Sequence, residues 1–374
     1  MNKITIQVFY MLQNLFKRNS SNQTTNSVFQ TMFIGGNAAN WTQSNYEQFA
    51  MEGYVRNVVA HRCIAMIARS ASFIDFKFGI IDQNGVFLEN TTHNLLKVFA
   101  RPNSQDSCYD LLEKIYSYKL IWGNVFLLVQ PNFEGTIASI SCLRPDRVTV
   151  LSNDEGDVIG YRYKKNKKTK EDYLIKNDGS CNIIHIKSFN PLNDFYGLSA
   201  MESAKYSIDQ HNEAAKYSKS LLQNSARPSG ALVVKATEYN NGGKLTKEQF
   251  ENLREQLYTQ HSGVENNGKP LILEGGLDWK EMSISPRDMD FIENKHVAAR
   301  EIALAFGVPS QLLGIPGDNT YSNMVEARAS LWEQTIIPLV QDVAKTLERG
   351  LGAILTDDDL TIQFDRTRIS ELSK

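Results

Sequence analysis

The sequence lacks the surplus of positive charge that proteins gripping nucleic acid usually carry. Its 374 residues include 40 Lys and Arg against 42 Asp and Glu, so the formal net charge is −2. Tight binding to DNA normally needs a basic surplus, because each neutralised phosphate releases counterions. If this chain meets DNA, we therefore expect it to hold the duplex loosely.

Cysteine is also scarce, and no Cys-x-x-Cys pair occurs. The four cysteines are widely separated, at Cys63, Cys108, Cys142 and Cys181. This favours free thiols that act as small buried hydrophobes in a reducing compartment, rather than disulfides. The six histidines show no zinc spacing. Nowhere do about 18 apolar residues follow one another, and the N-terminus has no small-residue cleavage site, so neither a membrane span nor a signal peptide is predicted.

Catalytic motifs are missing as well, including the Gly-x-Ser-x-Gly elbow. A phosphate-loop spacing occurs once, from Gly263 to Lys269, but Pro270 replaces the Ser or Thr that would hold magnesium. A helix precedes it and a strand follows, which is the reverse of the motif. We interpret it as a polar loop, with a nucleotide-binding enzyme as the alternative. The side chains of 357–359, three aspartates in succession, do not converge, so a turn is predicted there. No catalytic residue, cofactor or metal is expected.

What the sequence does contain is the composition of an ordinary folded protein, with 42% hydrophobic and 22% charged residues. Its length suggests two or three domains. Residues 19–45 are rich in Asn, Ser, Thr and Gln, which favours a flexible arm, taken to extend over residues 1–53.

A helix, a stiff loop and a longer helix form the segment around which the chain is organised. Ser285 as N-cap and Pro286 at the first helical position predict a helix that ends at Gly307, where Pro309 prevents continuation. The loop that follows, residues 308–317, is apolar but rich in proline and glycine, which fix it as a series of turns.

The second helix of this segment is expected to start between residues 319 and 322 and to end at Gly350. It would be about 28 residues and thus ~42 Å long. Pro338 lies in its interior, removes a backbone hydrogen bond and crowds the carbonyl of Gln334, so a bend is predicted there. Asp318 is expected to cap this helix.

Residues 54–197 are predicted to form an α+β domain that consists mostly of strands. Helical spacing of apolar residues runs from 54 to 71, and a hairpin turn is expected at Asn84-Gly85. Further helices are expected at 93–99 and from a Ser107/Asp110 capping box to Gly123. Strands are expected at 73–81, 86–88, 125–129, 137–143, 148–151, 158–163 and 183–186. The lysine-rich run 164–170 is interpreted as a solvated hairpin tip, because two acids follow it directly.

Another long helix is predicted from Ser199, which forms a capping box with Glu202, to residue 227. Between it and the helix at Ser285 lies a small α/β insert. Its expected elements are strands at 231–235, 270–273 and 279–284 and a helix capped by Thr246.

Several short motifs, taken together and in order, resemble the portal proteins of long-tailed bacteriophages, prophages and gene transfer agents. The resemblance covers residues 54–364. Its motifs are Leu143-Arg144-Pro145-Asp146-Arg147-Val148, Ile184-His185-Ile186, Tyr196-Gly197-Leu198-Ser199, Arg227-Pro228-Ser229-Gly230, Leu273-Glu274-Gly275-Gly276-Leu277, Phe306-Gly307-Val308-Pro309, Gly123-Asn124 and Arg101-Pro102-Asn103.

The resemblance implies an α+β portal-like protomer with a mixed wing, long stem helices, a small α/β clip and a long kinked helix. By position, the wing would span residues 54–197, the stem helices 198–228 and 286–306, and the clip 229–285. The tunnel loop would span 307–320, the kinked helix 321–350 and a C-terminal strand 351–374. Because the family usually continues with crown helices, a short or absent crown is expected.

The resemblance also implies a ring, usually of twelve copies, at one capsid vertex of a virion that is assembled in the bacterial cytoplasm. Double-stranded DNA would pass through it without sequence preference during packaging and ejection. The terminase large subunit, the major capsid protein and head-completion or adaptor proteins would be its partners, with no membrane involved. A neck adaptor ring without DNA contact is a further alternative.

Two groups of residues follow as candidate sites. The channel-lining group comprises Gln311, Leu312, Leu313, Asn319 and Thr320, although Leu312 and Leu313 could instead be buried between the helices. The partner-binding group of the clip comprises Lys247, Glu251, Arg254, Gln260 and Lys269.

Overall fold

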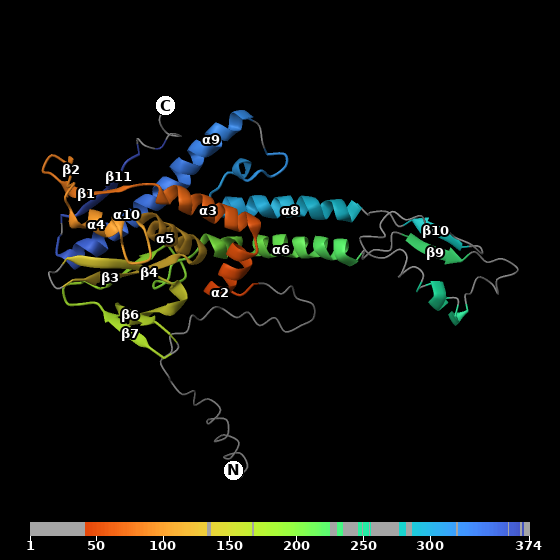
Figure 1. Ribbon diagram of the computed structural model, residues 1–374, viewed down its shortest axis with the longest axis horizontal. Coiled ribbons are helices and arrows are strands. Elements are labelled where there is room, and N and C mark those ends of the chain that lie inside the picture. The colour runs from red at the N-terminus through yellow and green to blue at the C-terminus, as the bar shows by residue number, and fades with distance from the viewer. Residues whose placement is uncertain are drawn as a thin grey trace, which may run out of the picture. The chain divides into compact units, whose positions relative to one another are not determined.

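The computed structural model describes residues 42–132, 136–166, 168–224, 230–234, 246–248, 250–253, 255, 277–281, 286–318, 321–357, 359–366 and 369 (Figure 1). The chain divides into two units, Met1–Asn40 and Trp41–Lys374, and the described residues belong to the second.

Helical structure begins at Tyr46, before residue 53, which was the predicted end of the flexible arm. Helix α2 (Tyr46–Gln48) leads into the π-helical η1 (Phe49–Val55), and α3 (Val58–Ser72) follows, capped by the side chain of Asn57. The Tyr46 ring packs edge-on against Tyr118 and Trp122, and Phe49 is buried. These aromatic contacts hold residues 46–53 against the body, so the arm cannot extend to residue 53.

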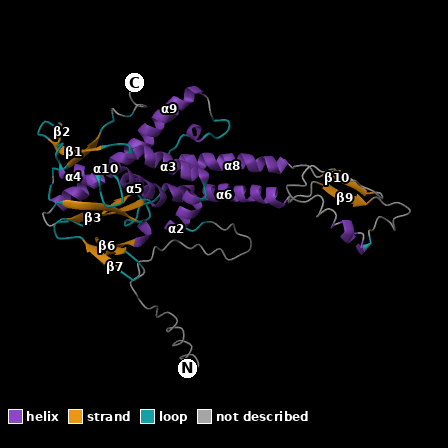
Figure 2. Ribbon diagram, in the orientation of Figure 1, coloured by secondary structure: helices purple, strands orange, loops and turns teal. Residues whose placement is uncertain are grey.

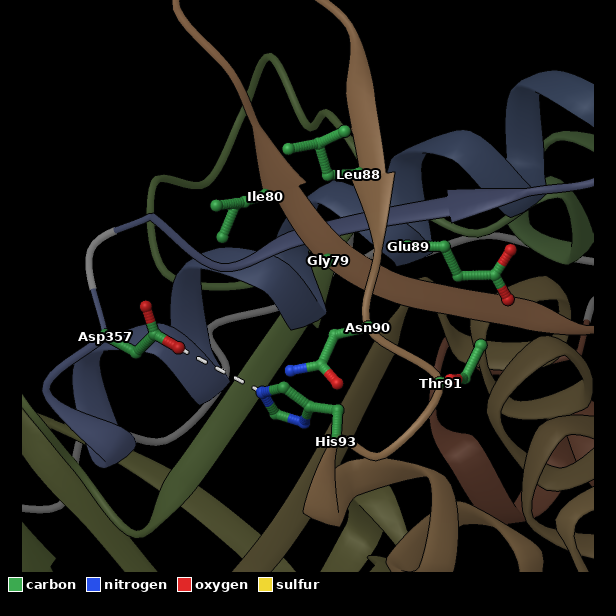
Figure 3. A pocket seen from close by; sticks show the side chains of 8 residues that line it. All are labelled: Gly79, Ile80, Leu88, Glu89, Asn90, Thr91, His93 and Asp357. Atoms are coloured by element: carbon green, nitrogen blue, oxygen red, sulfur yellow. Dashed lines mark ion pairs between the residues drawn. The ribbon is translucent and has the colours of Figure 1, made fainter.

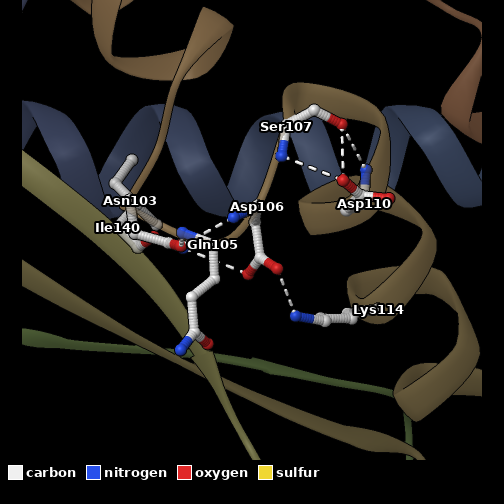
Figure 4. A network of polar contacts seen from close by, with 7 residues as sticks. All are labelled: Asn103, Gln105, Asp106, Ser107, Asp110, Lys114 and Ile140. Atoms are coloured by element: carbon white, nitrogen blue, oxygen red, sulfur yellow. Dashed lines mark hydrogen bonds and ion pairs between the residues drawn. The ribbon is translucent and has the colours of Figure 1, made fainter.

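Helices α4 (Asn94–Ala100) and α5 (Cys108–Trp122) confirm the expected helices of the wing. The predicted capping box at the start of α5 is present, with Ser107 and Asp110 bonded reciprocally. Asn103 fixes the preceding turn: its Oδ1 accepts from two backbone amides, and its Nδ2 donates to the carbonyl of Ile140, 3.0 Å away (Figure 4). Asp106 adds an ion pair to Lys114.

The strands within residues 76–187, together with the strand at 361–364, form three antiparallel sheets (Figure 2). Their orders are β11-β1-β2, β4-β3-β8 and β5-β6-β7. The bounds are β1 (Phe76–Ile81), β2 (Phe87–Glu89), β3 (Asn124–Pro131), β4 (Ile137–Leu143), β5 (Val148–Ser152), β6 (Val158–Lys164), β7 (Lys170–Leu174), β8 (Ile183–Lys187) and β11 (Thr361–Phe364). The lysine-rich run connects β6 to β7, so it lies at a hairpin tip as predicted, but strand β7 itself was not predicted.

The two long helices of the predicted stem are present and pack side by side (Figures 1 and 2). They are α6 (Ala200–Asn224) and α8 (Pro286–Ala305). Between them in the chain, β9 (Gly230–Val234) pairs antiparallel with β10 (Leu277–Glu281). The expected strand at 270–273 lies outside the described residues.

The last long helical segment differs from its prediction in two respects. It consists of α9 (Tyr321–Leu331), the π-helical η5 (Trp332–Ile336) and α10 (Ile337–Leu355). A π-helical turn lies directly before Pro338, and at its end the Ile337 amide donates to the Trp332 carbonyl. The helix also continues past Gly350 to Leu355. Gly350 packs closely on β8 instead of ending the helix, since a Cβ there would lie 2.8 Å from the side chain of Ile184.

One large apolar cluster joins the helices to the sheets, and a smaller one lies between the β3 and β5 sheets. The four cysteines are free thiols. Among the described helices, none is both long enough and apolar enough to span a lipid bilayer.

Candidate functional site

The loop between α8 and α9 is built from turns that glycine makes possible. Gly307 ends α8 with φ +66°, and the amide of Val308 donates back to the carbonyl of Ala303. A short 3₁₀ turn, η4 (Ser310–Leu313), follows and ends at Gly314 with φ +70°. Positive φ at both ends strongly favours glycine, so the backbone course of the loop is set by its sequence.

Gly307 also fixes where the loop leaves the body. Its carbonyl accepts a hydrogen bond from the Thr335 hydroxyl at 2.6 Å, which ties the loop to η5. A Cβ at Gly307 would lie only 2.7 Å from the Thr335 Oγ1. The two buried residues beside it, Phe306 and Val308, anchor the same junction in the core.

An ion pair closes the far end of the loop onto α8. The Arg300 Nε lies 3.2 Å from both carboxylate oxygens of Asp318, and Nη2 donates to the Pro316 carbonyl. The hydrogen bond from Arg300 holds the pKa of Asp318 below its usual value. Asp318 is not the predicted helix cap, because α9 begins at Tyr321, three residues further on.

The three predicted channel residues that the structure describes all lie in η4. Leu312 and Leu313 are half-buried and pack against the large apolar cluster. This favours the alternative in which both leucines face protein. Gln311 is also half-buried, and Asn319 and Thr320 lie outside the described residues. Residues 307–316 carry no charged side chain.

Polar contacts attach the stem pair to the body. Asn57, which caps α3, also donates from Nδ2 to the Asn212 Oδ1 and contacts the His211 Nδ1. Asn212 in turn donates to the Glu52 carbonyl. Burial lowers the pKa of His211, which keeps the ring neutral in this network. Sequence reasoning missed these residues, because their partners are more than 150 positions away.

The clip residues are only partly described. Lys247 and Glu251 are exposed on a helical stretch, whereas Arg254, Gln260 and Lys269 lie outside the described residues. The phosphate-loop lookalike ending at Lys269 lies outside them as well.

A groove of about 340 Å³ lies beside the β1–β2 hairpin (Figure 3). His93 and Asp357 face each other across it, with 4.0 Å between Nε2 and the carboxylate, and Ile80 and Leu88 form its apolar side. In the described residues, no cluster of three or more metal-binding side chains occurs here or elsewhere. The contact between His93 and Asp357 is a single long ion pair at the surface of the groove.

These elements define a mixed α/β protein with a body of helices and small sheets, a packed pair of long helices, a two-stranded β module and a glycine-shaped loop. The sequence profile of the family described as "Phage portal protein" matches residues 58–373. The chain belongs to this family, whose members are structural proteins.

Relatives agree with that assignment. A protein of Rickettsia felis is 42% identical over 370 residues, covering 97% of this chain and 91% of its own. The portal protein of Enterobacteria phage HK97 is 23% identical, covering 78% and 66% respectively. Among solved structures, a chain in the neck of a native gene transfer agent particle, computed with C12 symmetry, is 35% identical with a TM-score of 0.70. That match covers 89% of this chain and 87% of the neck chain.

Proposed function

We propose that twelve copies of this chain form a ring at one vertex of a capsid and conduct double-stranded DNA during packaging and ejection. The observation that carries the proposal is the likeness to a neck chain of C12 symmetry at 35% identity over 89% of the chain. The family match over residues 58–373 supports the same role.

The charges of the chain suit a conduit. A channel that lets DNA pass must not hold its phosphates, because every neutralised phosphate adds salt-dependent affinity. The formal net charge is −2, and residues 307–316 are uncharged. Arg300, which contacts this loop at the Pro316 carbonyl, is paired with Asp318 at 3.2 Å.

Imaging the purified protein by negative-stain electron microscopy tests the ring. We expect rings with an axial hole and, in averages, twelvefold symmetry. ATP hydrolysis that Lys269→Ala abolishes would instead support the nucleotide-binding enzyme.

The clip would dock the packaging motor, with the ring assembled in the bacterial cytoplasm and retained in the virion. Lys247 and Glu251, about one helical turn apart and both exposed, offer a test that leaves the fold intact. Reversing both charges should weaken pull-down of the terminase large subunit. The matched control reverses Glu213 and Lys216, an exposed ion pair on α6, and should leave motor binding unchanged. Equal binding by both variants would contradict the clip assignment.

A further inference from the structure

The loop between β8 and α6, residues 188–197, presents two large apolar side chains to solvent. Phe189 is 85% exposed and Leu192 is 92% exposed, the highest values for large apolar side chains in the described part of the chain. Two such exposed side chains three positions apart on one loop are a candidate binding surface.

Internal hydrogen bonds hold this loop in one conformation. Asn190 donates from Nδ2 to the Tyr196 carbonyl at 2.8 Å, and its Oδ1 accepts from the Leu192 amide at 3.0 Å. Asn193 accepts from the amides of Phe195 and Tyr196. The exposure of the two apolar side chains is therefore built into the loop.

Both ends of the loop are clamped to one place at the start of β3. The Ser188 amide donates to the Gly123 carbonyl, while the buried Asn124 accepts from the Gly197 amide at 2.7 Å and donates to its carbonyl at 3.0 Å. A Cβ at Gly197 would lie 2.2 Å from the Gly123 oxygen. A loop that is ordered before binding loses less conformational entropy when it docks.

The charge of the loop favours a protein partner over DNA. Residues 188–193 carry no charged side chain, and the amino group of Lys187 is bonded to the Asp194 carbonyl. Lys187 and Asp194 at its edges are of opposite charge, so the loop carries no positive surplus with which to hold phosphates. Apolar, uncharged and rigid surface is instead what the buried centre of a permanent protein interface requires.

We propose that Phe189 and Leu192 dock on a neighbouring copy of this chain, an inference that rests on the proposed ring. The neck chain at 35% identity stands in a C12 arrangement. In a cyclic ring each subunit contributes two different surfaces, because the contact is head-to-tail. The loop supplies one of these surfaces, and a region other than residues 188–197 supplies the other.

The first test compares assembly of two full-length variants by mass photometry. Phe189→Asp/Leu192→Asp should fold, as checked by circular dichroism, but should not form rings. The dissociation constant for each subunit contact should rise at least about tenfold, because burying a large apolar side chain contributes at least that much free energy. Phe73→Asp is the matched control, since Phe73 is 76% exposed in another part of the body, and it should form rings normally.

The second test places the photo-crosslinker p-benzoylphenylalanine at position 189. Cross-links within rings to a peptide of the same chain outside residues 188–197 are expected. Loop-to-loop cross-links, or cross-links only to capsid protein in whole particles, would overturn the inference. Rings formed equally by wild type and the double variant would overturn it while the proposed function stands. Wild-type protein that forms no ring would overturn the proposed function, and this inference with it.

Discussion

At the scale of residues, the loop between α8 and α9 depends on one neutralised cation. Arg300 makes hydrogen bonds to Asp318 and to the Pro316 carbonyl, and a longer contact of 3.4 Å to Glu293. The pair therefore both shapes the loop and removes a positive charge that a passing phosphate would otherwise meet.

Asp318→Asn should make the ring retain DNA. The amide keeps the size of the side chain but leaves Arg300 with only its longer contact to Glu293 in every subunit. DNA binding should therefore become stronger and more steeply salt-dependent. Binding of duplex DNA to purified rings between low and moderate salt measures this. The double variant Arg300→Gln/Asp318→Asn should return to wild-type binding, and retention by the double variant would contradict the explanation.

A second residue-scale prediction concerns pH. Burial lowers the pKa of His185 to about 3, with smaller contributions from Lys187 and Lys119. The ring stacks on Phe126, and Nε2 contacts the Asn124 Oδ1 at 3.0 Å. Below pH 6.5, the ordinary pKa of histidine, His185 takes up a proton in the unfolded chain but stays neutral in the folded chain. The free energy of unfolding should therefore fall as the pH drops through 6.5, by up to about 1.4 kcal/mol per pH unit.

Denaturant titrations between pH 7.5 and 5.5 check this dependence. His185→Gln should make the slope against pH shallower, whatever its effect on absolute stability. His61→Gln, at an exposed position, serves as the control and should keep the wild-type slope. An unchanged slope in His185→Gln would contradict the assignment.

At the scale of elements, local signals were predictable from the sequence and long-range ones were not. The Ser107 capping box and the Asn84-Gly85 turn, with Gly85 at φ +78°, need only neighbouring residues. Strand β7 was missed because its charged sequence is stabilised across the hairpin, by Arg162 paired with Asp172 and Tyr161 opposite Tyr173.

The candidate site shows the same division. Its turns followed from Gly307, Gly314 and Pro309, which act through their own backbone. The contact between Arg300 and Asp318 spans 18 positions, and that between Gly307 and Thr335 spans 28. Sequence spacing alone predicts neither contact, and Asp318 was therefore interpreted as the cap of the helix that follows.

Lysine substitutions in η4 test which of its half-buried side chains are needed for packing on the core. Gln311→Lys should fold and form rings but retain DNA in a salt-dependent manner. Leu312→Lys should instead lower the free energy of unfolding by about 1–2 kcal/mol, because a half-buried leucine that packs on the core is lost. Thermal unfolding and ring assembly of the two variants measure the difference. Equal stability would place Leu312 outside the core.

At the scale of the whole molecule, the sequence motifs mark places where distant segments meet. Gly123-Asn124 and Tyr196-Gly197 lie together at the base of the 188–197 loop, with Gly197 against the Gly123 carbonyl. Phe306-Gly307-Val308-Pro309 forms the junction of α8 with η5. The motifs that carry the family resemblance thus lie where packing constrains the protomer. The conduit function depends on the repetition of this protomer around an axis.

The most direct test of the central claim is a reconstruction of a DNA-filled particle by cryo-electron microscopy without imposed symmetry. We expect twelve copies of this chain at a single vertex, duplex DNA on the ring axis, and residues 308–318 around the narrowest part of the channel. A vertex without this chain, or a ring of it with no DNA on its axis, would contradict the account.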